Sequence, residues 1–200
     1  MSAEIYLVRH GETEWNKQQR IQGWLDSPLT AKGRDQAICL GQILAANLGA
    51  QHALPMHVSP LQRARETATI IRQYAYGPDV LPAVIPNVIY DPRIREMSLG
   101  AWEGMTREEV ESAYPDVADD DAWWFRAPGG ESYSQLKARI EEWISSLTSP
   151  VIAVSHGMAG RLIRGLLLGL PTEEALTLPS PQDVVWHLAD HRIEALTLIP

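Results

Sequence analysis

Two histidines stand at the ends of short apolar runs of the chain. Arg9 ends the run 4–9 and His10 follows it, whereas His156 comes two positions after the run 151–154. Short apolar runs of this kind are typical of buried strands, and open α/β sheets bind ligands beyond the carboxyl ends of their strands. A lone histidine in such a place is more often a structural hydrogen-bonding residue. Two of them beside an arginine indicate chemistry on an anionic group.

Two more charged residues could join that site. Arg63 follows a third candidate strand, 56–59, and Glu96 supplies a carboxylate in a connecting loop. A guanidinium group forms charge-assisted hydrogen bonds to phosphoryl or carboxylate oxygens, whereas a carboxylate can accept or donate a proton. Because the formal net charge of the chain is −8, a negatively charged substrate would need such a local positive site.

The periodicity of the chain predicts the elements that position these residues. Capping boxes begin at Thr106 and Ser132 and open helices toward residues 114 and 147. A closing strand pair turns at Asp190 and His191. The expected strands are 4–9, 56–59, 84–90, 151–154, 183–189 and 192–198, and the other expected helices are 30–48, 60–74 and 157–168. Alternating strands and helices predict a three-layer α/β/α sandwich with a mostly parallel central sheet.

Length and composition set wide limits on the class of protein. A chain of 200 residues with 45% hydrophobic residues can bury a core of its own, and no change in composition divides it. We therefore expect a single domain over residues 1–200. The acidic balance argues against partners bound through bulk positive charge, so we expect no nucleic acid and no membrane. One cysteine, Cys39, excludes an intramolecular disulfide and a multi-cysteine metal site.

No segment of the sequence resembles a secretory signal or a membrane span. The chain enters its first apolar run directly, without a basic region before a long hydrophobic stretch. The most apolar late segment, 162–170, is short and contains Arg164. We expect a cytoplasmic protein.

Five pieces of sequence, in order from residue 5 to about residue 165, resemble the histidine phosphatase superfamily. The branch in question contains cofactor-dependent phosphoglycerate mutases and small-molecule phosphatases, and it implies a phosphoglycerate mutase-like fold. A single Arg-His-Gly triplet would be weak evidence, but five ordered pieces are specific. They are 9–13 with Asn16, 23–30 with Gly33, 59–61 with Arg63 and Ala64, Glu96 with Gly100 and 102–104, and 155–157.

The resemblance implies a role for each candidate residue. His10 would be the nucleophile that becomes phosphohistidine, and Glu96 would protonate the leaving alcohol and later deprotonate the attacking water. The groups implied to bind the phosphoryl oxygens are Arg9, Arg63, His156, Asn16 and the backbone N–H of Gly157, which opens a helix. Gln22 and Gly23 lie in a segment that faces the substrate in relatives. The resemblance implies no metal and no cofactor.

The function that follows is a phosphomonoesterase acting on a small phosphorylated metabolite. The alternative is a cofactor-dependent phosphoglycerate mutase, which uses the same groups but returns the phosphoryl group to the sugar acid. His156 lies only 60 residues after Glu96, whereas mutases of the family carry a longer insertion there. A third hypothesis, a non-catalytic phospho-ligand binding module, would show a degraded site, and every expected residue type is present.

The segment 116–130 is the irregular part of the chain. Trp123, Trp124 and Phe125 are expected to form one wall of a pocket for the organic part of the ester. The acidic run 119–121 would repel a second anionic group of the substrate unless Arg107 or Arg126 offsets it. Two tryptophans outside this segment, Trp24 and Trp102, are expected to be packing residues.

Overall fold

The computed structural model of the protein describes residues 4–48, 54–76, 87–117 and 122–198. A six-stranded sheet lies at its centre, in the order β3-β2-β4-β1-β5-β6. β1 to β4 pair in parallel with one another, whereas β5 is antiparallel to both β1 and β6. The strands are β1 (Ile5–Arg9), β2 (Met56–Val58), β3 (Val88–Tyr90), β4 (Val151–Ser155), β5 (Val185–Ala189) and β6 (Arg192–Leu196).

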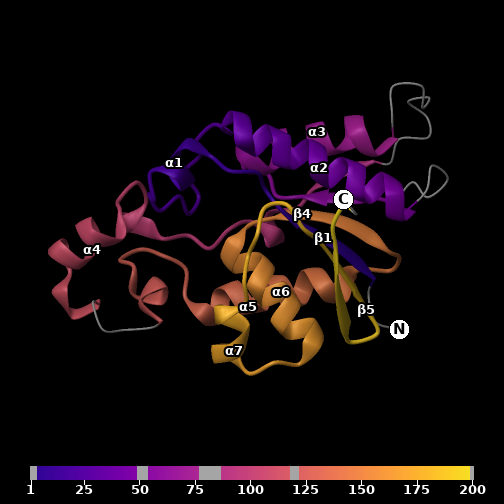
Figure 1. The fold of residues 1–200 in the computed structure, drawn as a ribbon. Helices are drawn as coiled ribbons and strands as arrows, with labels where there is room; N and C mark the ends of the chain where they lie inside the picture. Colours follow the sequence, from indigo (N-terminus) through magenta and orange to yellow (C-terminus); the bar gives the residue numbers. More distant parts are fainter. Residues whose placement is uncertain (1–3, 49–53, 77–86, 118–121, 199–200) are drawn as a thin grey trace.

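Helices cover both faces of the sheet (Figure 1). α2 (Ala31–Leu48) and α3 (Gln62–Tyr76) pack against each other on one face. α5 (Tyr133–Ser146), α6 (Gly157–Leu168) and the short α7 (Thr172–Thr177) lie on the other. The predicted α/β/α sandwich with a mostly parallel sheet is therefore confirmed.

The central strands are buried on both faces, which explains their continuous apolar sequences. In β1, Ile5 and Leu7 belong to the core beneath α5 and α6, whereas Tyr6 and Val8 belong to the core beneath α2 and α3. β4 alternates between the same two cores. Each fully buried aliphatic side chain of this kind contributes about 1.5–3 kcal/mol. The two cores together hold the carboxyl ends of the strands at one edge.

A long connection between β3 and α5 extends beyond the sheet at the left of Figure 1. It contains α4 (Arg107–Ala113) and four 3-10 helices, and both predicted capping boxes, at Thr106 and Ser132, are present. The 3-10 helices are η1 (Pro92–Ile94), η2 (Gly100–Trp102), η3 (Pro115–Val117) and η4 (Trp123–Arg126). The segment expected to be irregular is thus partly helical, and its acidic run 119–121 lies outside the described residues.

Several predicted boundaries differ from the structure, and residues 84–86 of the predicted strand 84–90 lie outside the described residues. The helix predicted from residue 60 begins at Gln62, because the Asp26 carboxylate accepts hydrogen bonds from the backbone N–H groups of Gln62 and Arg63. The closing strands are shorter than predicted, but the turn is where it was expected. Asp190 and His191 have φ angles of 48° and 58°, the left-handed conformation of a tight hairpin turn.

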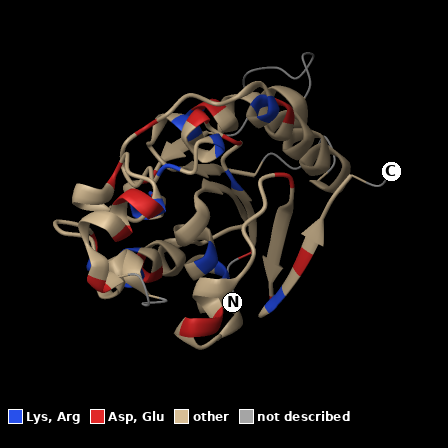
Figure 2. Ribbon diagram, turned by 60° about the vertical axis from the view of Figure 1, so that its left-hand side comes forward, with Lys and Arg blue, Asp and Glu red and all other residues tan. Residues whose placement is uncertain are grey.

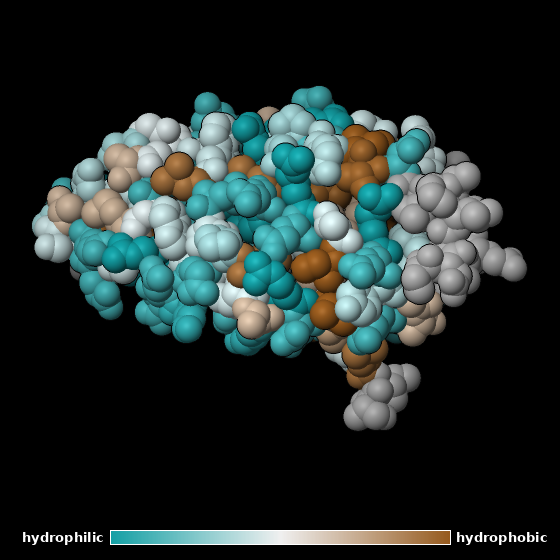
Figure 3. All heavy atoms as spheres, turned by 90° about the horizontal axis from the view of Figure 1, so that it is seen from above, coloured by the Kyte–Doolittle hydropathy of each residue, from teal (hydrophilic) through white to brown (hydrophobic). Residues whose placement is uncertain are grey.

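Acidic and basic residues are interspersed over most elements (Figure 2), and the face seen from above carries hydrophobic residues in small groups among hydrophilic ones (Figure 3). Among the described residues, no helix has both the length and the apolar character that crossing a membrane requires.

Candidate active site

Three adjacent parallel strands bring His10, His156 and Ser59 to one edge of the sheet. In the β1–β4 ladder Arg9 lies beside Ser155, so the two histidines leave neighbouring strands at the same level. Their ring centroids lie 5.1 Å apart. Ser59 follows β2, the next strand, and donates its backbone N–H to the carbonyl of Val154. His10 and His156, which are 146 positions apart in the sequence, are therefore neighbours in the structure.

His10 is held in one tautomer by its own turn. Its Nδ1 lies 2.8 Å from the carbonyl oxygen of Gly11, and a carbonyl can only accept, so Nδ1 carries the proton. Nε2 therefore presents a lone pair, and the Nε–H of Arg63 points to it from 3.3 Å. Burial, followed by the charges of Arg63 and Arg9, holds the pKa of His10 well below its usual range. The imidazole is neutral at pH 7 and able to act as a nucleophile.

Gly11 is required by a close approach between two segments. A Cβ atom there would lie 2.1 Å from the carbonyl oxygen of Gly33 in α2. The backbone N–H of Gly11 also donates to the hydroxyl of Thr67 in α3. The residue after His10 is thus fixed against both helices of one face, which fixes the imidazole.

Arg63 is almost fully buried, at 1% exposure, and its guanidinium group is fully oriented by the chain segment before it. Nη1 donates to the Asp26 carboxylate at 2.9 Å and to the carbonyl of Leu25, and Nη2 donates to the carbonyl of Gly23 at 2.7 Å. Gly23 has a φ of +54°, and a Cβ there would meet the carboxylate of Glu103 at 2.1 Å. Gly23 therefore acts on Arg63 through its backbone.

Arg9 has one end of its guanidinium group fixed and another without a partner. Nη1 donates to the carbonyl of Ser180 at 2.6 Å, whereas the buried Nε has no hydrogen-bond partner. Burial lowers the pKa of Arg9, although an arginine stays charged at neutral pH.

His156 has the same combination of a fixed and a free nitrogen. Its Nε2 lies 2.6 Å from the hydroxyl of Ser59, and its buried Nδ1 has no partner. The Ser59 oxygen also accepts from the N–H of Leu61 and keeps a second lone pair, so the donor in the contact with Nε2 depends on the tautomer of His156. Burial, then the charge of Arg63, holds the pKa of His156 well below its usual range, so the ring is neutral. When the Ser59 hydroxyl donates to Nε2, the proton of the neutral ring lies on Nδ1.

Three of the candidate residues carry buried polar atoms without a hydrogen-bond partner, as do Arg72, Tyr76 and Trp102 elsewhere among the described residues. In the candidate residues the atoms are Nε of Arg9, Nδ1 of His156 and Oε1 of Gln22. Buried polar groups in folded proteins almost always have a hydrogen-bond partner, so unpaired ones call for an explanation. A bound polar group would provide the partners.

Glu96 lies against the N-terminus of α6. Its Oε1 accepts from the backbone N–H groups of Met97 and Ala159 at 3.0 and 3.1 Å, and its Oε2 accepts from that of Met158 at 3.2 Å. The helix N-terminus that the sequence suggested for a phosphoryl group thus holds this carboxylate in the structure. Gly157 lies between the charged groups, since a Cβ there would be 3.5 Å from Glu96 and 3.7 Å from Arg9.

A cavity of about 210 Å³ lies beside Arg9 and Glu96. Trp124 lines it, as expected. Trp123 packs on Trp102 and lines a second pocket, of about 470 Å³, together with Trp124 and Asn16, whereas Phe125 contacts Tyr133. The lining residues of the first cavity are Arg9, Glu96, Met97, Leu99, Trp124, Gly157, Met158, Arg161 and Ser180. The small volume suits a small ligand.

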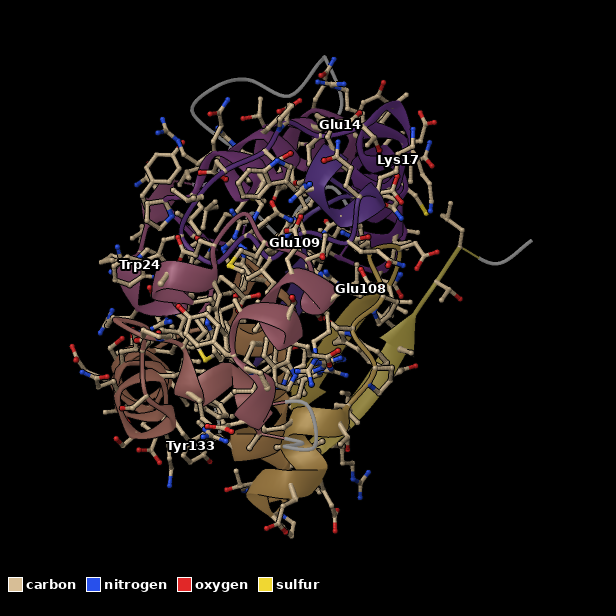
Figure 4. All side chains as sticks on the ribbon, turned by 90° about the vertical axis from the view of Figure 1, so that its left-hand side faces the viewer. Glu14, Lys17, Trp24, Glu108, Glu109 and Tyr133 are labelled. Carbon is tan, nitrogen blue, oxygen red and sulfur yellow. The ribbon has the colours of Figure 1, made fainter. Side chains whose placement is uncertain are left out.

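The two tryptophans expected to be packing residues differ. Trp102 is fully buried, as expected, but Trp24 is 39% exposed. The indole N–H of Trp24 donates to the backbone carbonyl of Glu96, and the guanidinium of Arg95 stacks on its ring at 3.9 Å. Figure 4 views the end of the molecule that carries Trp24. In that view α4, marked by Glu108 and Glu109, lies between α1 (Glu14–Lys17) and Tyr133 of α5.

Asn16 lies apart from the cavity beside Arg9 and Glu96. Its Oδ1 accepts from the backbone N–H of Thr13, which completes the capping box of α1, and from the amide of Gln182 at 3.2 Å. The same Gln182 amide donates to the backbone carbonyl of His10 at 3.0 Å. Asn16 is therefore linked to His10 through Gln182.

Sequence reasoning missed several residues that orient the site. Ser59 and Asp26 stand within quoted motifs, so their positions could have drawn attention. Gln182 lies 172 positions from His10 and follows no motif, so no sequence signal identifies it. Arg161, one helical turn after Gly157, could have been found from its i, i+4 spacing. Among the described residues, no group of three or more His, Cys, Asp or Glu side chains could hold a metal ion.

Fold and site together define a class of protein. A mostly parallel sheet presents two neutral imidazoles, the buried guanidinium of Arg63 and the half-buried one of Arg9 at the carboxyl edge of its strands. This arrangement is suited to binding an oxyanion and attacking it. The model of the histidine phosphatase superfamily (branch 1) matches residues 5–190. The chain belongs to this superfamily, as the sequence motifs predicted.

Relatives in the superfamily include both mutases and phosphatases. The chain is 37% identical to a probable phosphoglycerate mutase GpmB of Salmonella paratyphi C, over 84% of this chain and 76% of that protein. A putative alpha-ribazole-5'-P phosphatase of Escherichia coli has 25% identity and a TM-score of 0.78, covering 99% of this chain and 97% of that one. A mycobacterial glucosyl-3-phosphoglycerate phosphatase in complex with VO3 has 27% identity and a TM-score of 0.73, covering 98% and 99%.

Proposed function

We propose that the protein is a phosphomonoesterase that hydrolyses a small phosphorylated metabolite through a phosphohistidine at His10. The observation that carries this proposal is the neutral His10, whose unprotonated Nε2 faces the buried guanidinium of Arg63. An imidazole in this state is a nucleophile that a phosphate dianion does not repel. The buried, unpartnered atoms of Arg9 and His156 supply donors for the phosphoryl oxygens.

In the first step the Nε2 lone pair of His10 forms a bond to phosphorus as the ester P–O bond breaks. Arg9, Arg63 and Nδ1–H of His156 stabilise the charge that spreads over the phosphoryl oxygens, which is where most catalysis of phosphoryl transfer arises. The carboxyl group of Glu96, in the same cavity as Arg9, gives its proton to the leaving alkoxide.

In the second step water replaces the alcohol. The Glu96 carboxylate accepts a proton from water, the water oxygen bonds to phosphorus, and the electron pair of the N–P bond returns to Nε2 of His10. The Nδ1–H of His10 donates to the carbonyl of Gly11 throughout, so the ring is ready for a new cycle.

The alternative function is a phosphoglycerate mutase, which the 37% identity to a probable mutase favours. Hydrolysis is favoured by the two phosphatases of similar structure and by the short stretch of 60 positions from Glu96 to His156. A mutase must keep water from the phosphohistidine while its substrate re-orients. We propose that this stretch is too short to do so.

One assay separates these functions. The protein is supplied with 3-phosphoglycerate and a trace of 2,3-bisphosphoglycerate, and both free phosphate and 2-phosphoglycerate are followed. We expect phosphate release to exceed isomerisation. Isomerisation that clearly outruns phosphate release, at rates far above those on other esters, would establish the mutase instead. Phosphate release from no ester in a broad panel, with ligand binding retained, would favour the non-catalytic binding module.

The proposal extends to properties that the sequence suggested. We propose that residues 1–200 form a single domain, that the protein acts in the cytoplasm, and that neither a metal nor another cofactor takes part. Its partner is a small phosphorylated metabolite, rather than a nucleic acid or a membrane. The similarity to a putative alpha-ribazole-5'-P phosphatase and to a glucosyl-3-phosphoglycerate phosphatase supports a small phosphorylated substrate.

A further inference from the structure

The cavity beside Arg9 and Glu96 contains a third charged side chain that the proposed mechanism does not use. Arg161 lies on α6 four residues after Gly157, so it is on the same helix face as Gly157. Helical side chains lean toward the N-terminus of their helix. The guanidinium of Arg161 therefore lies close to the first turn of α6, where Gly157 separates Glu96 from Arg9.

Arg161 has donors to spare. Its Nε donates to the backbone carbonyl of Leu178 at 2.7 Å. Among the described residues, its Nη1 and Nη2 groups make no hydrogen bond, and no carboxylate lies within ion-pair distance of it. Burial lowers the pKa of Arg161, and Glu96 acts in the opposite direction. The Nη edge of the guanidinium is thus available to a ligand.

The remaining walls of the cavity limit what this ligand can be. Met97, Leu99, Met158 and Trp124 are apolar, and the volume is about 210 Å³. With the phosphoryl group on Arg9 and Arg63, the cavity retains the positive Arg161 and the carboxyl group of Glu96 that the mechanism uses as proton donor. The organic part of the ester therefore meets apolar contacts and one guanidinium edge, which matches the two oxygens of a carboxylate.

Building on the proposed phosphatase function, we propose that Arg161 binds a carboxylate on the organic part of the substrate, so that the substrates are phosphate esters of short hydroxy acids. A second phosphate fits less well, because one guanidinium edge in a small apolar cavity provides too few donors for three charged oxygens. This reverses the expectation that the acidic run 119–121 disfavours a second anionic group. Arg161 is a cation that this expectation did not include.

The test compares ester pairs that differ by a carboxylate. Glycerol 3-phosphate carries a hydroxymethyl group where 3-phosphoglycerate carries its carboxylate, and phosphoethanolamine lacks the carboxylate of phosphoserine. We expect the wild-type protein to prefer the acid of each pair. Arg161→Met should lower kcat/KM for the acids at least about tenfold, mostly through KM, and change it less than about twofold for their partners. Arg161→Lys, which keeps the charge but not the planar edge, should lie between.

Arg34→Met is the matched control, since it removes the same charge from the exposed surface of α2, where Arg34 pairs with Glu66. It should leave the preference unchanged. An equal loss on both members of a pair in Arg161→Met, or no preference in the wild type, would overturn the assignment of the carboxylate to Arg161.

A failure of the proposed phosphatase function can be distinguished from a failure of the carboxylate site. If no ester, including 4-nitrophenyl phosphate, releases phosphate, the phosphatase is excluded. Calorimetric binding of 3-phosphoglycerate and glycerol 3-phosphate to the wild type and to Arg161→Met then still decides the matter. Tighter binding of the acid that Arg161→Met abolishes supports the carboxylate site, and equal binding of both compounds rejects it.

Discussion

The site has two regions that are built differently. The floor consists of His10, Arg63 and His156, none more than 2% exposed. The rim consists of Trp124 and Arg161, which are partly exposed, with Glu96. Arg9 joins the two, since it lies beside the floor and lines the rim cavity.

Floor side chains are oriented by several segments at once. The carbonyls of Gly11 and Gly23, the carboxylate of Asp26 and the hydroxyl of Ser59 each bind one of them. At the rim, Glu96 is likewise held by three backbone N–H groups, whereas Arg161 donates from its Nε to one backbone carbonyl. Catalytic groups must be held in one geometry, whereas groups that select a substrate can adapt to it. Under the proposed function, the floor holds the nucleophile and two groups that bind the phosphoryl oxygens, whereas the rim holds the proton donor Glu96 beside the proposed carboxylate-binding Arg161.

The largest expected effect comes from removing the nucleophile of the floor. His10→Ala should lower kcat at least about a thousandfold on every ester, because no other group can form the phosphoryl intermediate. Acid-labile phosphate trapped from a labelled substrate should map to His10 in the wild type. His191→Ala, which removes an exposed histidine outside the site, should keep normal activity. Near-normal turnover by His10→Ala would show that the floor does not carry the reaction.

A smaller and more selective effect is expected from Glu96 at the rim. Glu96→Gln removes the exchangeable proton and should lower kcat about a hundredfold for alkyl phosphates, whose leaving groups need protonation. The phosphorylation step with 4-nitrophenyl phosphate, followed as a burst, should lose much less. Arg63→Ala in the floor should lower the rate about a hundredfold or more for both kinds of ester.

The thermal unfolding midpoints of these variants must be compared with that of the wild type. Three backbone N–H groups donate to the Glu96 carboxylate, and the NH2 group of the introduced glutamine would face at least one of them, which would destabilise the fold. Equal losses on both kinds of ester in a folded Glu96→Gln protein, measured in the burst, would contradict the difference between rim and floor.

The smallest expected effect is on stability, through the two neutral imidazoles of the floor. Their pKa values are lowered in the folded state, so below about pH 6.5 the unfolded state binds more protons. Above that pH, the two neutral imidazoles do not lower the free energy of unfolding, which keeps its full value. It should fall as the pH drops toward the lowered values, by up to about 1.4 kcal/mol per pH unit for each histidine.

Urea unfolding at pH 7.5, 6.5 and 5.5 measures this dependence, in a range above the titration of ordinary carboxylates. His156→Gln should reduce the slope, and His191→Ala should leave it unchanged. A slope that stays the same in His156→Gln would mean that this ring is not kept neutral by burial.

Much of the fold could be predicted because the signals are local. The apolar runs of β1 and β4, the helical spacing of α2 and the capping boxes at Thr106 and Ser132 each involve residues a few positions apart. Helix and strand periods act over the same short range, so sequence and structure agree there. The boundary at Gln62 differed because the capping carboxylate, Asp26, comes from a distant loop.

The order of residues along the chain specifies which side chains are available for chemistry: two histidines after strands, two arginines and one glutamate. Their states depend on the tertiary structure. It places the Gly11 carbonyl where it fixes the tautomer of His10, the Ser59 hydroxyl against His156, and Gln182 against His10. It also leaves Trp24 exposed and brings Arg161 into the cavity. These outcomes depend on burial and on hydrogen bonds between segments far apart in the chain, and no local pattern of residues encodes which distant segments will meet.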